Sequence, residues 1–141
     1  MHVHSSYDYA IVRVVPCVER GEFINVGVIL FCKTRRFLGM RVSLDIERLV
    51  ALAPTIDLDG VQHQLTILQR ICDGGREAGS IGQLSQAERF HWLVAPRSTI
   101  IQTSPVHSGL CADPEATIEH LLHTMVVVHP AEVLEDEKWS G

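Results

Sequence analysis

The first third of the chain consists of apolar runs separated by short turns. Residues 7–17 and 22–32 are rich in β-branched and aromatic side chains, a composition that favours β-strands. The four residues between them end in Gly21, so we expect a hairpin whose turn uses the positive φ that glycine adopts without strain. A second turn at 33–36 leads into a third expected strand at 37–43. The pattern therefore predicts an antiparallel meander.

Two features of the sequence predict details of this meander. The second strand is apolar at nearly every position, which is typical of a central strand covered on both faces. Pro16, near the end of the first strand, has no backbone N–H to donate to a neighbouring strand. We therefore expect the first strand to fray or bulge near Pro16.

From residue 45 onward the apolar positions recur at helical spacing. A short helix is expected over 45–53, ending before Pro54, because the residue before a proline avoids the helical conformation. Asp57 or Asp59 can cap a longer helix that ends at Gly74, a residue type common just past helix ends. The apolar face of this longer helix is expected to consist of Val61, Leu65, Leu68 and Ile71.

The remaining segments predict two more helices and one more strand. Ser85 and Glu88 have the spacing of a capping box, which opens a short helix. Residues 98–104 return to β-branched character and predict a fourth strand. Asp113, followed by proline and glutamate, predicts the start of a last helix that runs to about Val128. The inward side chains of this last helix are expected to be Ile118, Leu121, Leu122 and Met125.

The order of these elements, strands first and then helices with one late strand, is that of an α+β fold. We expect a single domain over residues 1–130, in which an antiparallel meander of three to four strands packs with three to four helices. Residues 131–141 are expected to form an acidic, loosely held C-terminal tail.

Length and composition describe a globular protein. The 141 residues fit one domain, and 46% hydrophobic with 21% charged residues exclude an intrinsically disordered chain. No apolar run reaches the roughly 18–20 residues of a membrane span, and the first ten residues lack the pattern of a secretory signal. The four cysteines are scattered along the chain, so we expect reduced thiols in a cytoplasmic protein.

The charge is distributed unevenly along the chain. The net charge is −5 overall, +2 over residues 1–50 and −7 over residues 51–141. An acidic protein repels a phosphate backbone, which argues against nucleic acid as a partner. Ten of the twelve basic residues are arginines, however, and arginine makes planar, bidentate contacts with carboxylates and phosphates. A local anion-binding site is therefore compatible with the overall charge.

Polar side chains inside the first two strands are the first candidate site. Arg13 lies within the apolar run IVRVV, and Asn25 lies within the run FINVGV. Buried groups of these types are costly unless they find partners. One interpretation is an anion-binding site in which Arg13 holds a ligand that Asn25 and Glu22 orient. The other is that Arg13 lies at the surface or pairs with a core carboxylate. A three-residue turn places Arg13 and Asn25 on one face, whereas a two- or four-residue turn separates them.

The segment around the fourth strand is the second candidate site. Arg97 and Ser98 could hold an anion, and His107 could act as a general acid or base on a loop near them. No nucleophile-elbow motif and no evident aspartate partner for His107 accompany them. His120 and His123 lie three residues apart on the last expected helix, and His107 and Cys111 lie four residues apart, but zinc needs three or four such ligands together. We expect no metal and no cofactor.

Two long blocks of the sequence resemble a known family. They are YDYAIVRVVPCVERGEFINVGVILFC at 7–32 and ERFHWLVAPRSTIIQTSPVHSGL at 88–110. Both are similar to the bacterial domain-of-unknown-function family numbered 3037, over roughly residues 7–128. The resemblance implies no established activity, cofactor or catalytic residue. Genes of that family often neighbour genes for HipA-like protein kinases, so the resemblance also implies such a kinase as a candidate partner, by association.

These observations leave two main hypotheses about function. The first is a non-catalytic interaction or regulatory module. The second is a small enzyme or ligand-binding protein for a phosphorylated or carboxylated molecule. A concave pocket that unites Arg13, Arg97 and His107 would favour the second, whereas a flat or apolar exposed patch would favour the first. A structural oligomer that uses an edge strand stays open beside them.

Overall fold

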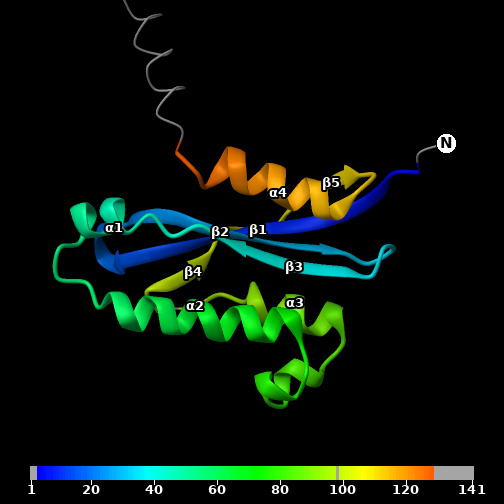
Figure 1. The fold of residues 1–141 in the computed structure, drawn as a ribbon, viewed down its shortest axis with the longest axis horizontal. Helices are drawn as coiled ribbons and strands as arrows, with labels where there is room; N and C mark the ends of the chain where they lie inside the picture. Colours follow the sequence, from blue (N-terminus) through cyan, green and yellow to red (C-terminus); the bar gives the residue numbers. More distant parts are fainter. Residues whose placement is uncertain (1–2, 98, 129–141) are drawn as a thin grey trace, which may run out of the picture.

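A five-stranded antiparallel sheet lies between two layers of helices (Figure 1). The computed structural model describes residues 3–97 and 99–128. The strands are β1 (Ser5–Cys17), β2 (Glu22–Cys32), β3 (Phe37–Val42), β4 (Ile101–Thr103) and β5 (His107–Cys111). The helices are α1 (Ile46–Leu52), α2 (Leu58–Asp73), α3 (Gln86–Leu93) and α4 (Pro114–Met125), with short 3-10 turns η1 (Val18–Arg20), η2 (Arg76–Ala78) and η3 (Ile81–Gln83).

The predicted α+β fold and its meander are confirmed. The strands lie in the order β3-β2-β1-β4, and β5 pairs with the other half of β1. β2 is central and almost wholly buried, as its continuous apolar sequence predicted. Gly21 closes the β1–β2 turn with a φ of +69°. Asp57 caps α2, and Ser85 and Glu88 form the capping box of α3.

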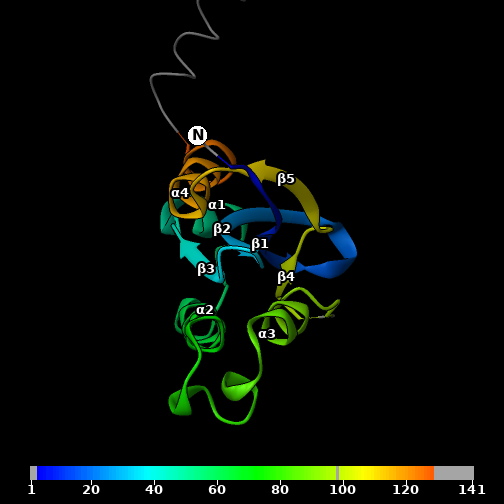
Figure 2. The ribbon, with the colours of Figure 1, turned by 90° about the vertical axis from the view of Figure 1, so that its right-hand side faces the viewer.

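Each face of the sheet has its own hydrophobic core. α2 and α3 cover one face and α4 covers the other (Figure 2). The core beneath α2 and α3 includes Val12, Val14, Ile24, Val26, Ile29, Phe31 and Met40 from the sheet. The core beneath α4 includes Ile11, Val28, Leu30, Cys32 and Cys111 from the sheet. β2 needs both layers because its side chains are apolar in both directions.

Three predictions about the second half of the chain need correction. The fourth strand is shorter than expected, Ile101–Thr103, and a fifth strand that contains His107 was not predicted. β5 holds a glycine and three polar or weakly strand-forming residues, so its pairing with β1 determines its conformation more than its composition does. The last helix ends at Met125, whose side chain is 45% exposed and not inward. Ser98 and the expected tail at 131–141 lie outside the described residues.

Two bulges interrupt the pairing of β1 with β2. Val12 pairs with Gly27 and Arg13 pairs with Asn25, so Val26 is an extra residue on β2. Val14 pairs with Ile24 and Cys17 with Glu22, so β1 gains an extra residue next to Pro16, where a bulge was expected. The second bulge restores the register that the first one shifts.

No helix among the described residues is both long enough and apolar enough to cross a membrane. All four cysteines are free thiols, and only Cys17 is exposed. Burial raises the pKa of the Cys72 thiol to about 12, so this thiol stays protonated and poorly nucleophilic near neutral pH.

We expect one fast-reacting thiol in the native protein. Ellman's reagent at pH 8 should modify Cys17 rapidly and leave Cys32, Cys72 and Cys111 unmodified until denaturant is added. The Cys17→Ser variant should show no fast phase. A second fast thiol in native buffer would contradict the burial of the three others.

Candidate functional site

Arg13 and Asn25 lie directly opposite each other on the face of the sheet that α4 covers. They are paired residues of β1 and β2, and paired residues of an antiparallel ladder project to the same side. The β1–β2 loop has four residues, which without bulges would have put the two side chains on opposite faces. The bulge near Pro16 shifts the register by one residue and brings them together, and the bulge at Val26 restores the register beyond the pair.

The guanidinium of Arg13 rests on an aromatic ring. Its Cζ lies 4.2 Å from the centroid of the Phe23 ring, a cation–π contact that holds the side chain in place. Gln102 of β4 pairs with Arg13 on its other side, and its amide donates to the Thr99 carbonyl. Arg13 makes no hydrogen bond or ion pair with any described residue, and its Nε is buried without an acceptor.

Asn25 connects this pair to the end of α4. Its Nδ2 donates a hydrogen bond of 3.1 Å to the carbonyl oxygen of Met125, one of the carbonyls that a helix leaves without an internal partner. Its Oδ1 is buried and receives no hydrogen bond. Phe23 and Met125 are 44% and 45% exposed beside it. We call these four residues, Arg13, Phe23, Asn25 and Met125, the Arg13 surface.

Phe23 and Met125 did not stand out in the sequence as candidate residues. Phe23 lies two residues before Asn25 on the same strand, so the period of two would have placed it on the same face. Met125 has the helical spacing of the inward residues of α4, so the sequence predicted a buried side chain. That spacing does not show that the helix ends at this residue and leaves it exposed. At that point the Met125 carbonyl accepts a hydrogen bond from Asn25.

Glu22 lies at the tip of the hairpin and forms an ion pair with Arg20. Both side chains are largely exposed. Glu22 is thus paired within the tip and is not an acceptor for Arg13.

Arg97 lies near the end of α3, on the other side of the sheet from α4. Its Nη1 and Nη2 donate to the carbonyls of Leu93 and Trp92 at 3.3 and 2.5 Å, and its Cζ lies 4.3 Å from the Trp92 ring. Burial lowers the pKa of this guanidinium, and the carbonyls at the helix end compensate its charge. Ser98, the predicted partner of Arg97, lies outside the described residues.

Arg97 lines two cavities, of about 160 and 290 Å³. The smaller is largely apolar and lies between α2 and Trp92; the larger borders β4 and includes Gln102, Thr103 and Ser104. Neither cavity includes Arg13 or His107.

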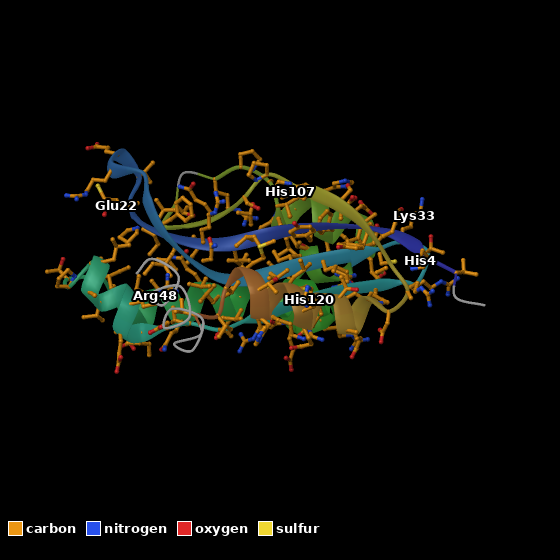
Figure 3. All side chains as sticks on the ribbon, turned by 90° about the horizontal axis from the view of Figure 1, so that it is seen from above. His4, Glu22, Lys33, Arg48, His107 and His120 are labelled. Carbon is orange, nitrogen blue, oxygen red and sulfur yellow. The ribbon has the colours of Figure 1, made fainter. Side chains whose placement is uncertain are left out.

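Ser104 and His107 have separate surroundings. Ser104 is buried, accepts the Ile11 N–H at 2.9 Å and donates to the Pro105 carbonyl at 2.9 Å, so it holds the chain after β4 against β1. His107 is exposed on β5, with its ring centroid 5.5 Å from that of Tyr9. In Figure 3, His107 lies near the middle of the molecule and Glu22 at the hairpin end. The structure therefore does not gather Arg13, Arg97 and His107 into one pocket.

No group of three His, Cys, Asp or Glu side chains within residues 3–97 and 99–128 is placed to hold a metal ion. The polar features that have no internal explanation in the described part are the buried atoms of Arg13 and Asn25. A third buried atom, Nε of Arg89, belongs to a guanidinium that already donates to the carbonyls of Leu84 and Cys72.

A family model described as a protein of unknown function, DUF3037, matches residues 9–126. The chain belongs to this family. The DUF3037 match runs from β1 to just past the end of α4, so it includes Arg13, Asn25 and the segment around Arg97. No curated protein and no solved structure matches the chain.

We expect Ser104 to be a structural residue. Ser104→Ala leaves the buried N–H of Ile11 without an acceptor and should lower the free energy of unfolding by about 1–3 kcal/mol. Urea denaturation measures this loss. The matched control, Ser6→Ala at an exposed position of β1, should change it by about 0.5 kcal/mol or less. Equal effects of the two variants would show that the Ser104 hydrogen bonds do not hold this segment.

The two arginines that stack on aromatic rings should respond differently to replacement. Arg97→Met removes the donors to two carbonyls and should cost about 1–3 kcal/mol of unfolding free energy. Arg13→Met removes no hydrogen bond and keeps an apolar stem, so its change should stay within about 1 kcal/mol. Urea denaturation of both variants tests this contrast. A loss of about 3–5 kcal/mol for Arg13→Met would instead indicate a buried ion pair.

Proposed function

We propose that the protein is a non-catalytic, cytoplasmic interaction module that docks onto another protein through the Arg13 surface. The observation that carries this proposal is the state of Arg13: a partly buried cation, held on Phe23, that has no anionic partner among the described residues. The described fold supplies no negative charge for this guanidinium, and a charge-assisted hydrogen bond to a carboxylate is stronger than a neutral hydrogen bond. A docking partner is one source of that charge.

The surroundings of Arg13 suit a protein partner better than a small molecule. Phe23 and Met125 are apolar and exposed; the Phe23 ring contacts Arg13, and the Met125 carbonyl accepts from Asn25. Aromatic residues, methionine and arginine are the residue types enriched at protein interfaces. The cavities that Arg97 lines are separate from Arg13, and the polar side chains of Arg97 and Ser104 are occupied by backbone groups.

The HipA-like protein kinase that the family resemblance suggests is the first partner to test. The purified kinase and the full chain should co-elute on size-exclusion chromatography at micromolar concentration. Arg13→Met and Phe23→Ala should each weaken the complex about tenfold or more, because both remove contacts at the centre of the proposed interface. Calorimetric titration of each variant measures the change.

Arg76→Met is the matched control for this experiment. Arg76 is exposed in η2, below α2 and on the opposite side of the molecule from α4 (Figure 1). The Arg76→Met variant should bind the kinase as tightly as the unmodified chain does. Independent elution of the kinase and this chain would rule out that partner, and equal weakening by Arg76→Met and Arg13→Met would rule out the Arg13 surface as the docking site.

A further inference from the structure

We infer that the smaller of the two cavities beside Arg97 binds a small organic monocarboxylic acid, with its carboxylate on the Arg97 guanidinium and its apolar body between α2 and Trp92. This ligand site is separate from the Arg13 surface and goes beyond the proposed function. The inference rests on the size and lining of the cavity, on the unused donors of Arg97 and on the charge of the lining.

The cavity lies between α2 and the end of α3, two helices that lie side by side beneath the sheet (Figure 2). Its volume is about 160 Å³, close to the roughly 150 Å³ of an apolar protein cavity that takes up benzene. The apolar part of its lining comes from Ile67, Leu68, Trp92 and Ile101. Leu68 and Ile101 are buried, whereas Ile67 is 39% exposed and lies at the rim. The cavity therefore has room for about one six-membered ring or a branched chain of similar size.

Arg97 has donors left for a ligand. Its terminal nitrogens donate to the carbonyls of Leu93 and Trp92, and a guanidinium carries more N–H groups than these two carbonyls accept. Among the described side chains, Nε of Arg97 is not one of the buried polar atoms that lack a partner, so a ligand can reach it. The Trp92 ring, 4.3 Å from Cζ, holds the guanidinium in place at the cavity.

The charge of the lining favours an anionic ligand. Arg97 is the only charged residue in the described lining of this cavity and of the neighbouring one, and no carboxylate of a described residue pairs with it. The carbonyls that it contacts are dipoles without net charge. Burial lowers the pKa of the Arg97 guanidinium, because water solvates its charge less completely there than at an open surface. The group stays protonated at neutral pH, so an anion bound beside it meets a cation that water screens only in part.

A monocarboxylate fits this site better than a phosphate ester. One guanidinium matches one carboxylate, whereas a phosphate dianion would keep an uncompensated charge against the apolar wall. Gln64 also lines the cavity and has no hydrogen-bond partner among the described residues, so its amide is available to the bound acid. The volume limits the rest of the ligand to about one ring, which a free small molecule provides.

The test is a calorimetric titration of the full chain with benzoate, which joins one carboxylate to one ring. We expect saturable binding with a Kd of about 1 mM or tighter. Benzamide has nearly the same shape without the charge, and it should bind about tenfold more weakly or worse. Acetate lacks the ring and should also bind about tenfold more weakly or worse. Phenyl phosphate should bind no more tightly than benzoate.

Two variants of α2 locate the site without touching Arg97. Ile67→Glu places a negative charge at the rim on an exposed helix position, so the chain should fold and its affinity for benzoate should fall about tenfold or more. Gln62→Glu is the matched control, because it adds the same charge to the same helix, where Gln62 lines a different cavity beside β3. The Gln62→Glu and Arg13→Met variants should bind benzoate as tightly as the unmodified chain does.

Arg97→Lys tests the guanidinium directly. It keeps the charge but loses the planar fork of donors, and should weaken benzoate binding severalfold. If this variant does not fold, the comparison of Ile67→Glu with Gln62→Glu decides.

The inference is overturned by equal binding of benzoate and benzamide, by tighter binding of acetate or phenyl phosphate than of benzoate, or by equal affinities of the two α2 variants. Loss of benzoate binding in Arg13→Met would overturn it as well, since the anion would then lie on the Arg13 surface.

Discussion

The offset pairing of β1 with β2 is the constraint on which the rest of the molecule depends. β2 is apolar in both directions, so it is stable only with a helical layer on each face of the sheet. β1 carries β2 along one edge and both β4 and β5 along the other. The two bulges in this ladder decide which side chains of the pair meet α4 and which meet α2. Without them Arg13 would face Val26, and Asn25 would project into the opposite core.

The length and position of α4 determine how much of the sheet face beneath it is exposed to solvent. An ion pair between Arg41 and Glu119 holds it over β3, and Asn25 holds its last carbonyl. The helix ends beside Asn25, and the Arg13 surface begins at that point. The contrast between Arg13 and Arg97 follows from this arrangement: a helix end neutralises Arg97, whereas Arg13 lies beside a helix end whose carbonyl Asn25 has already taken.

Most of the fold could be predicted from the sequence because its signals are local. The capping residues Asp57 and Ser85, the apolar face of α2 and the bulge near Pro16 each depend on a few neighbouring residues. β5 could not be predicted, since its pairing with β1 joins residues about a hundred positions apart. The candidate site was predicted in part. Arg13 and Asn25 stood out as polar residues in apolar strands, but their meeting depends on the exact register after the bulge near Pro16, and the proline predicts an irregular strand end without fixing that register.

The two bulges shift the register of β1 against β2 in opposite directions, so the pairing beyond them is the same as in a hairpin without bulges. The facing of the side chains therefore depends on whether residues are added in odd or even numbers. Adding or deleting one residue at either bulge would turn the strand beyond it by half a repeat and exchange its polar face for its apolar face. Adding two residues to each strand would lengthen the hairpin, and each existing side chain would stay on the same face of the sheet. In this chain the hairpin can therefore lengthen by two residues in each arm without changing which face its side chains occupy, whereas an odd change in one arm needs a second odd change in the same pair of strands.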